Sequence, residues 1–205
     1  MKYKVLLKCN ELSIVMGKQT KFLQSVPGVA LVTVLLLLVP LVAMQFTDEV
    51  AWSVGDFIIV GALLFGTGLS YIFIIRKMDN IVYRAAVGLA LGTTLVMVWA
   101  NLAVGLIGAG PNPGNLMYMG VVAVGITAAI LSRFKPGGME RALYATALTL
   151  VLVAIVALLA KMDEYPGSSI AEIIGVNGFF AIMFTLSGLL FRYVAMVQAP
   201  EKSEG

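Results

Sequence analysis

The sequence contains no histidine, one cysteine and few charged residues, and each shortage excludes a kind of functional site or a class of protein. Without histidine, the chain cannot build a histidine-ligated haem, an H-E-x-x-H zinc site or a Ser-His-Asp triad. Cys9 alone can form neither an internal disulfide nor a C-x-x-C site. Charged residues make up 12% of the 205 residues, about half the fraction of a typical soluble domain.

What the chain has instead is apolar sequence, which indicates a membrane protein. Hydrophobic residues make up 60% of the chain, and a core of this size cannot hide them all from water. A membrane-spanning helix needs about 20 apolar residues, whereas barrel strands alternate and are shorter. We therefore expect an all-α transmembrane bundle with six spans. The charge-free stretches that predict them are Val26–Phe46, Phe57–Ile75, Ala85–Ile107, Leu116–Ser132, Ala142–Ala160 and Ile173–Phe191.

The distribution of basic residues predicts the orientation of this bundle. If the N-terminus lies in the cytoplasm, 13 of the 14 basic residues lie on the cytoplasmic side and only Lys161 lies outside. Short cytoplasmic segments are enriched in Lys and Arg, so we expect both termini in the cytoplasm of a bacterial inner membrane. The charge of +3 arises from these anchors and does not suggest nucleic-acid binding.

Three regions follow along the chain. Residues 1–25 form a basic cytoplasmic segment that either makes an interfacial helix or, if translation starts at Met16, is partly absent from the protein. Residues 26–192 form the membrane domain, and residues 193–205 form a cytoplasmic tail.

Several segments resemble a known family. The first is Met44–Asp56, which contains Met-Gln-Phe-Thr-Asp-Glu-Val, and the second is Val98–Gly108, which contains Trp-Ala-Asn. The third is Asn115–Tyr118, which reads Asn-Leu-Met-Tyr, and the fourth is Gly175–Phe180. Together they resemble a family of small multi-pass bacterial inner-membrane proteins for which no activity is established. The resemblance runs from about residue 22 to residue 192, and it implies the six-span architecture but no catalytic role.

Two S-x-x-[DE] patterns are typical of helix N-termini. Ser53 with Asp56 and Ser169 with Glu172 match a capping box, in which the hydroxyl bonds a free N–H and the acid complements the helix dipole. Asn115 is similarly placed to cap the fourth span. We expect structural roles for these residues, with ligand binding as the alternative.

Asparagine side chains inside the spans call for another explanation, because an unpartnered amide in hydrocarbon is costly. Asn101 and Asn177 are expected at similar depth near the outer face, and each either bonds a neighbouring helix, contacts a ligand or meets another subunit. The uncharged loop of residues 108–115 could fold back towards them, which predicts an outward polar pocket. Trp and Tyr near span ends also fit an aromatic belt, the interpretation we favour for Trp52 and Tyr118. The candidate pocket residues are Trp99, Asn101, Asn112, Asn115, Tyr118 and Asn177.

Small residues in the spans predict close helix contacts, either within the bundle or between proteins. The glycines that we expect at such contacts are Gly61, Gly88, Gly92, Gly120 and Gly125.

The function favoured by these observations is a non-catalytic scaffold or accessory subunit that binds lipid and membrane helices, its own copies included. A small channel or solute-binding protein with the Asn101 and Asn177 pocket is the alternative. Nucleophile–base pairs and phosphate-binding loops are missing, and no charged group lies within the six charge-free stretches, so we expect no enzyme, cofactor or metal site.

Overall fold

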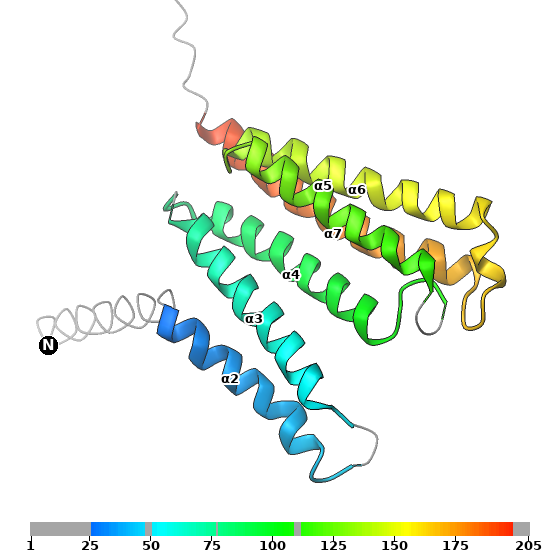
Figure 1. Cartoon of the computed structure of the whole chain (residues 1–205). Helices are drawn as coiled ribbons and strands as arrows, with labels where there is room; N and C mark the ends of the chain where they lie inside the picture. The colour runs from blue at the N-terminus through cyan, green and yellow to red at the C-terminus, as the bar shows by residue number, and fades with distance from the viewer. Residues whose placement is uncertain (1–25, 48–50, 77, 109–111, 199–205) are drawn as a thin grey trace, which may run out of the picture. The chain divides into compact units, whose positions relative to one another are not determined.

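The computed structural model describes residues 26–47, 51–76, 78–108 and 112–198. Within these ranges it has six helices long and apolar enough to cross a membrane, as the sequence predicts (Figure 1). The predicted N-terminal segment, residues 1–25, and residues 199–205 of the predicted tail lie outside the described part. The chain divides into two compact units, residues 1–73 and 74–205.

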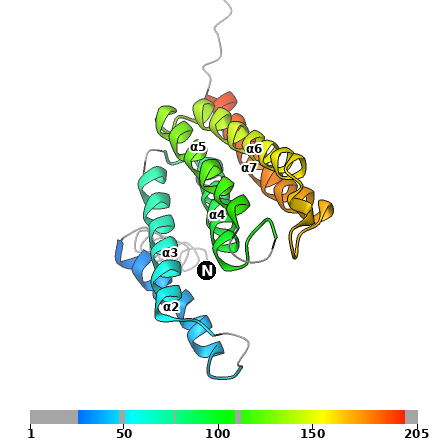
Figure 2. The same cartoon turned by 45° about the vertical axis from the view of Figure 1, so that its right-hand side comes forward.

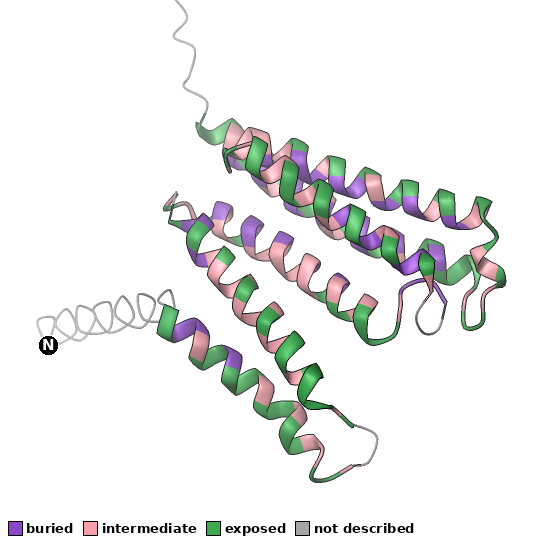
Figure 3. Cartoon of the chain, viewed as in Figure 1, coloured by how far each residue is buried: buried purple, intermediate pink, exposed green. Residues whose placement is uncertain are grey.

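Unit 1 contains α2 (Val26–Ala43) and nearly all of α3 (Val54–Ile75). The two helices approach each other at glycines. A Cβ atom on Gly68 would lie 2.5 Å from Cγ1 of Val29, and one on Gly61 would lie 3.2 Å from Cδ1 of Leu37. Most of α2 is exposed, which suits a helix surrounded by lipid (Figure 3).

Unit 2 contains four long helices, α4 (Ile81–Ala103), α5 (Met117–Leu131), α6 (Pro136–Leu159) and α7 (Ile170–Gln198). The 3₁₀ turns η1 (Pro113–Leu116) and η2 (Met162–Glu164) lie in two of the connections. α7 packs against α4 and α6, and α6 also packs against α5 (Figures 1 and 2). α7 is therefore a central helix, although it comes last in the chain.

The packing of unit 2 follows a regular spacing of buried residues. The buried residues of α7 at intervals of four and three are Ile173, Asn177, Phe180, Phe184, Ser187, Phe191 and Val194. Those of α6 with the same spacing are Met139, Leu143, Thr146, Leu150, Val153 and Ala157. This is the heptad spacing of helices that cross at a small angle.

Polar and aromatic contacts join the helices of unit 2 in its interior. The Tyr83 hydroxyl of α4 donates to the Phe134 carbonyl at 2.9 Å, and its ring packs edge-on against Phe191 of α7. The Ser187 hydroxyl of α7 donates to the Ala86 carbonyl of α4 at 2.7 Å. Because α4 and α7 are far apart in the sequence, these contacts were not foreseeable from local patterns.

Most helices begin earlier than the charge-free stretches do. α4 begins at Ile81, where the Asn80 side chain accepts from the N–H groups of Val82 and Tyr83 at 2.8 and 3.0 Å. α7 continues to Gln198, past the predicted start of the tail at residue 193. The helices therefore carry charged residues at their ends, outside the apolar stretches.

Candidate functional site

The candidate site lies at the end of unit 2 where α4 leads into α5. α4 ends at Ala103, and Gly105 takes a left-handed conformation with φ of +83° that reverses the chain. Leu106 and Ile107 are then buried, so their backbone N–H groups need partners away from water.

Asn115 provides these partners. Its Oδ1 accepts from the N–H groups of Leu106 and Ile107, both at 2.9 Å. Its backbone carbonyl accepts from Nδ2 of Asn101 at 3.2 Å. The prediction that Asn115 caps the fourth span is therefore wrong, because the N-cap of α5 is Leu116 and the Asn115 side chain bonds the preceding loop instead. One buried amide closes the loop over the end of α4.

The same loop packs against the connection between α6 and α7. A Cβ atom on Gly108 would lie 3.2 Å from Cβ of Tyr165, and one on Gly114 would lie 3.0 Å from Sδ of Met162. Within the loop, Nδ2 of Asn112 donates to the Ile107 carbonyl. The loop therefore folds onto its own bundle, as the pocket hypothesis supposes.

Asn177 belongs to a second polar group. The Tyr118 hydroxyl of α5 lies 3.3 Å from Oδ1 of Asn177 on α7, and Nδ2 of Asn177 donates to the Ile173 carbonyl at 2.9 Å. Both side chains are about 1% exposed. The buried position of Tyr118 differs from the aromatic belt favoured by the sequence, because this hydroxyl has its partner inside the protein. Asn101 and Asn177 thus use different partners.

The two tryptophans lie apart from these polar groups. Trp99 is 44% exposed, so much of its surface lies outside the core. Trp52, in unit 1, packs against Phe57 with a ring-centroid distance of 5.3 Å. The structure thus brings together Asn101, Asn112 and Asn115, and separately Tyr118 and Asn177.

The predicted capping residues lie at helix starts. The Ser53 backbone N–H and hydroxyl both donate to Oδ2 of Asp56, at 2.7 and 2.8 Å, and the Asp56 N–H donates back to the Ser53 hydroxyl. At α7, the N–H of Glu172 donates to the Ser169 hydroxyl at 3.1 Å. The Asp56 carboxylate and the Ser53 hydroxyl therefore cap the start of α3, and the Ser169 hydroxyl caps the start of α7.

Three buried polar atoms in or beside the candidate site have no hydrogen-bond partner among the described residues. They are Oδ1 of Asn101, Oδ1 of Asn112 and the hydroxyl oxygen of Ser168. Two of the three are pure acceptors, so they can accept from water or from a donor group of a ligand.

The structure also bears on the predicted glycine contacts. Gly125 lies against Thr146 of α6, where a Cβ atom would come within 3.2 Å of the hydroxyl, and Gly61 faces α2. At Gly92 and Gly120, a Cβ atom would meet no described atom of unit 2 within 4 Å. A close glycine contact between α6 and α7 was not predicted. A Cβ on Gly188 would lie 2.7 Å from Cε1 of Tyr144, and only the small pair Ser187-Gly188 signals it in the sequence.

Among the described residues, no three His, Cys, Asp or Glu side chains gather as metal ligands would, and Cys9 lies outside that part. The arrangement offers amide and carbonyl hydrogen bonds. No family model, no curated protein and no solved structure matches this chain.

Proposed function

We propose that the protein is a non-catalytic membrane scaffold or accessory subunit that binds other membrane helices along α4 and α5. The observation that carries this proposal is the open space at Gly92 and Gly120. Glycine destabilises a helix by about 1 kcal/mol relative to alanine, so a glycine that no neighbour within the unit requires calls for another explanation. In membrane proteins the usual explanation is that a further helix approaches closely at the glycine.

The interior polar groups fit the same proposal. Asn115, Asn177 and Ser187 each bond backbone groups of their own unit. Such bonds stabilise one conformation of the bundle. A protein that binds partners through a helix face requires a fixed conformation of this kind. Membrane lipid would cover the remaining exposed apolar surface.

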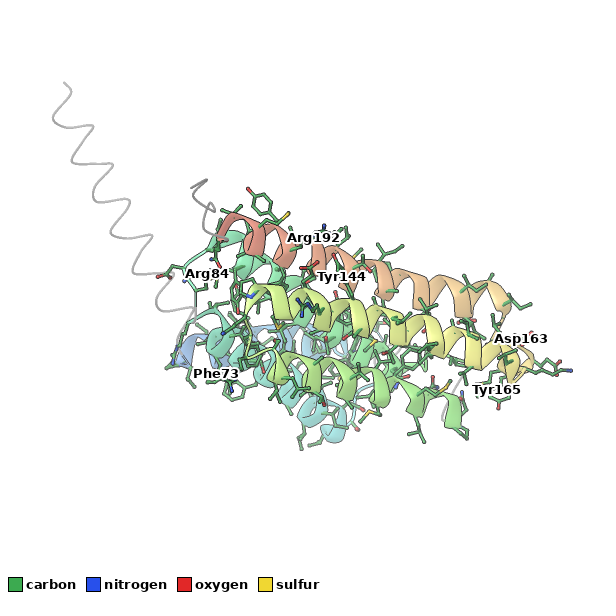
Figure 4. The ribbon with its side chains drawn as sticks, turned by 90° about the horizontal axis from the view of Figure 1, so that it is seen from above. Phe73, Arg84, Tyr144, Asp163, Tyr165 and Arg192 are labelled. Carbon is green, nitrogen blue, oxygen red and sulfur yellow. The ribbon has the colours of Figure 1, made fainter. Side chains whose placement is uncertain are left out.

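The proposal includes a location in a bacterial inner membrane with both termini in the cytoplasm. Its support is the charge difference between the two ends of unit 2. The basic end carries Arg76, Arg84, Arg133, Lys135, Arg141 and Arg192 with two acids, Asp79 and Glu140. The acidic end carries Lys161, Asp163, Glu164 and Glu172. Figure 4 shows Arg84 and Arg192 near one end of the bundle and Asp163 and Tyr165 near the other. Basic ends face the cytoplasm.

The test is co-purification from membranes in mild detergent. Gly92→Leu with Gly120→Leu fills both open positions, and we expect loss of the associated chains with unchanged helix content. Ala171→Leu, at an exposed position of α7, is the matched control and should keep them. Retention of every partner by the double variant would exclude these faces.

A second candidate function is a small channel or solute-binding protein. The unpartnered oxygens of Asn101 and Asn112 favour it, since they would accept hydrogen bonds from a neutral solute. Asn177, bonded to Tyr118, would then stabilise the bundle beside the pocket. The test measures urea and glycerol flux into liposomes. Asn101→Leu should lower the flux without changing partner association, and equal flux in protein-free liposomes would reject this candidate.

A further inference from the structure

The turn between α5 and α6 presents basic side chains from a fixed backbone. Arg133 and Phe134 both take left-handed conformations, with φ of 51° and 60°. The Phe134 carbonyl accepts from the Tyr83 hydroxyl, and its N–H donates to the Ser132 hydroxyl at 3.2 Å. Gly138 packs so closely on Ser132 that a Cβ atom would lie 2.6 Å away. The positions of Arg133 and the neighbouring Lys135 are therefore set by the bundle itself.

The acids near this turn are already engaged with other cations. Asp79 lies 3.0 Å from Arg84, and Glu140 lies 3.9 Å from Arg192. Arg133, Lys135 and Arg141 are all exposed and have no acidic partner within the described part of the chain. We call these three residues the turn cluster. Its three positive charges are accessible to an anion from outside the described residues.

An apolar strip on α6 begins directly beside the turn cluster. Arg141, Ala145, Leu148 and Leu152 are spaced by four, three and four residues, so they share one helix face. All four are exposed, Leu148 by 60% and Leu152 by 52%. On α5, Leu131 is 78% exposed two residues before Arg133. A molecule that fits this surface has an anionic head and a long apolar tail.

We propose that the turn cluster binds an anionic phospholipid, with the phosphodiester held by Arg133, Lys135 and Arg141 and an acyl chain along Ala145, Leu148 and Leu152. Arg141 lies about 9 Å along the helix from Lys135, and its long stem allows the guanidinium to reach the headgroup layer. Basic residues just outside a span attract anionic lipid at short range. An acidic protein segment would match the charges but would leave the apolar strip unused.

The experiment uses the full chain reconstituted with phosphatidylcholine and phosphatidylglycerol, followed by native mass spectrometry of the retained lipid. We expect preferential retention of phosphatidylglycerol. Combining Arg133→Gln, Lys135→Gln and Arg141→Gln should reduce that preference about tenfold or more. Lys161→Gln, which removes a basic residue at the opposite end, is the matched control and should change little. Melting in pure phosphatidylcholine should be equal for all variants, which shows that the triple variant folds.

Four results would overturn the proposal. The first is equal retention of the two lipids by the wild type. The second is an unchanged lipid preference in the triple variant, and the third is an equal loss of preference in Lys161→Gln. The fourth is displacement of the retained phosphatidylglycerol by millimolar inorganic phosphate, which would assign the cluster to a free anion. The outcome is independent of partner co-purification, so it stands or falls separately from the scaffold function.

Discussion

Units 1 and 2 are both made of apolar helices, but they are held together differently. In unit 1 the helices approach at Gly61 and Gly68, and most of α2 remains exposed. In unit 2 the helices bury regular stripes of side chains and are also joined by hydrogen bonds across the bundle. The comparison teaches that length and hydropathy establish a span, whereas buried polar groups and stripe spacing establish which spans form a specific bundle.

The largest expected effect of a single substitution comes from the amide that closes the loop of unit 2. Asn115→Leu removes the acceptor of two buried N–H groups, those of Leu106 and Ile107. Unpaired buried donors cost about 1–3 kcal/mol each, so for two donors we expect about 2–6 kcal/mol of destabilisation. Thermal unfolding of the full chain in detergent measures it. Leu116→Ala, at an adjacent side chain that is 69% exposed, is the control. Equal stability of both variants would contradict the assigned role.

The next largest effect is expected at the closely packed glycines, which allow the two units to be compared. Gly188→Ala forces the Tyr144 ring to move between α6 and α7, and we expect about 1–3 kcal/mol of destabilisation. Gly68→Ala meets Val29 on the mostly exposed α2, which can shift at less cost. In the single chain, separated from any partner helix, Gly92→Ala should be neutral or stabilising, because no described atom of unit 2 crowds it. Unfolding curves of the three variants give the order, and a larger loss for Gly68→Ala would reverse the comparison.

The smallest expected effect concerns the polar link between α5 and α7. Tyr118→Phe removes the hydroxyl that faces Asn177. Hydrogen bonds between membrane helices average about 0.6 kcal/mol, so we expect a loss of that order. The same unfolding assay measures it, with Tyr193→Phe at an exposed position of α7 as the control. A loss of stability many times larger would contradict this value and would mean that the two side chains belong to a wider hydrogen-bond network.

The sequence was sufficient for the number and type of spans, because a charge-free run of about 20 residues has few structural alternatives. It could not show which face of each helix is buried. In α6 the exposed Leu148 and Leu152 are as apolar as the buried Leu150, so hydropathy does not separate the two faces. The heptad spacing became visible only once the buried positions were known.

The candidate site was predictable in its residue types more than in its contacts. The side-chain amides of Asn101, Asn115 and Asn177 need hydrogen-bond partners, because an amide without a partner in an apolar interior costs free energy. Their partners do not follow, because Asn115 bonds N–H groups eight and nine residues earlier and Asn177 meets Tyr118 across 59 positions. Such pairs are set by how helices and loops pack, which no local spacing encodes.

The central claim is that the chain belongs to a larger assembly of membrane helices joined at Gly92 and Gly120. Mass measurement of the full chain released from its membrane in native lipid particles tests it most directly. We predict a particle whose protein mass exceeds the 21.8 kDa of one chain, and a return to that mass in the variant with Gly92→Leu and Gly120→Leu. A wild-type particle that contains a single 21.8 kDa chain and no other protein would contradict the claim.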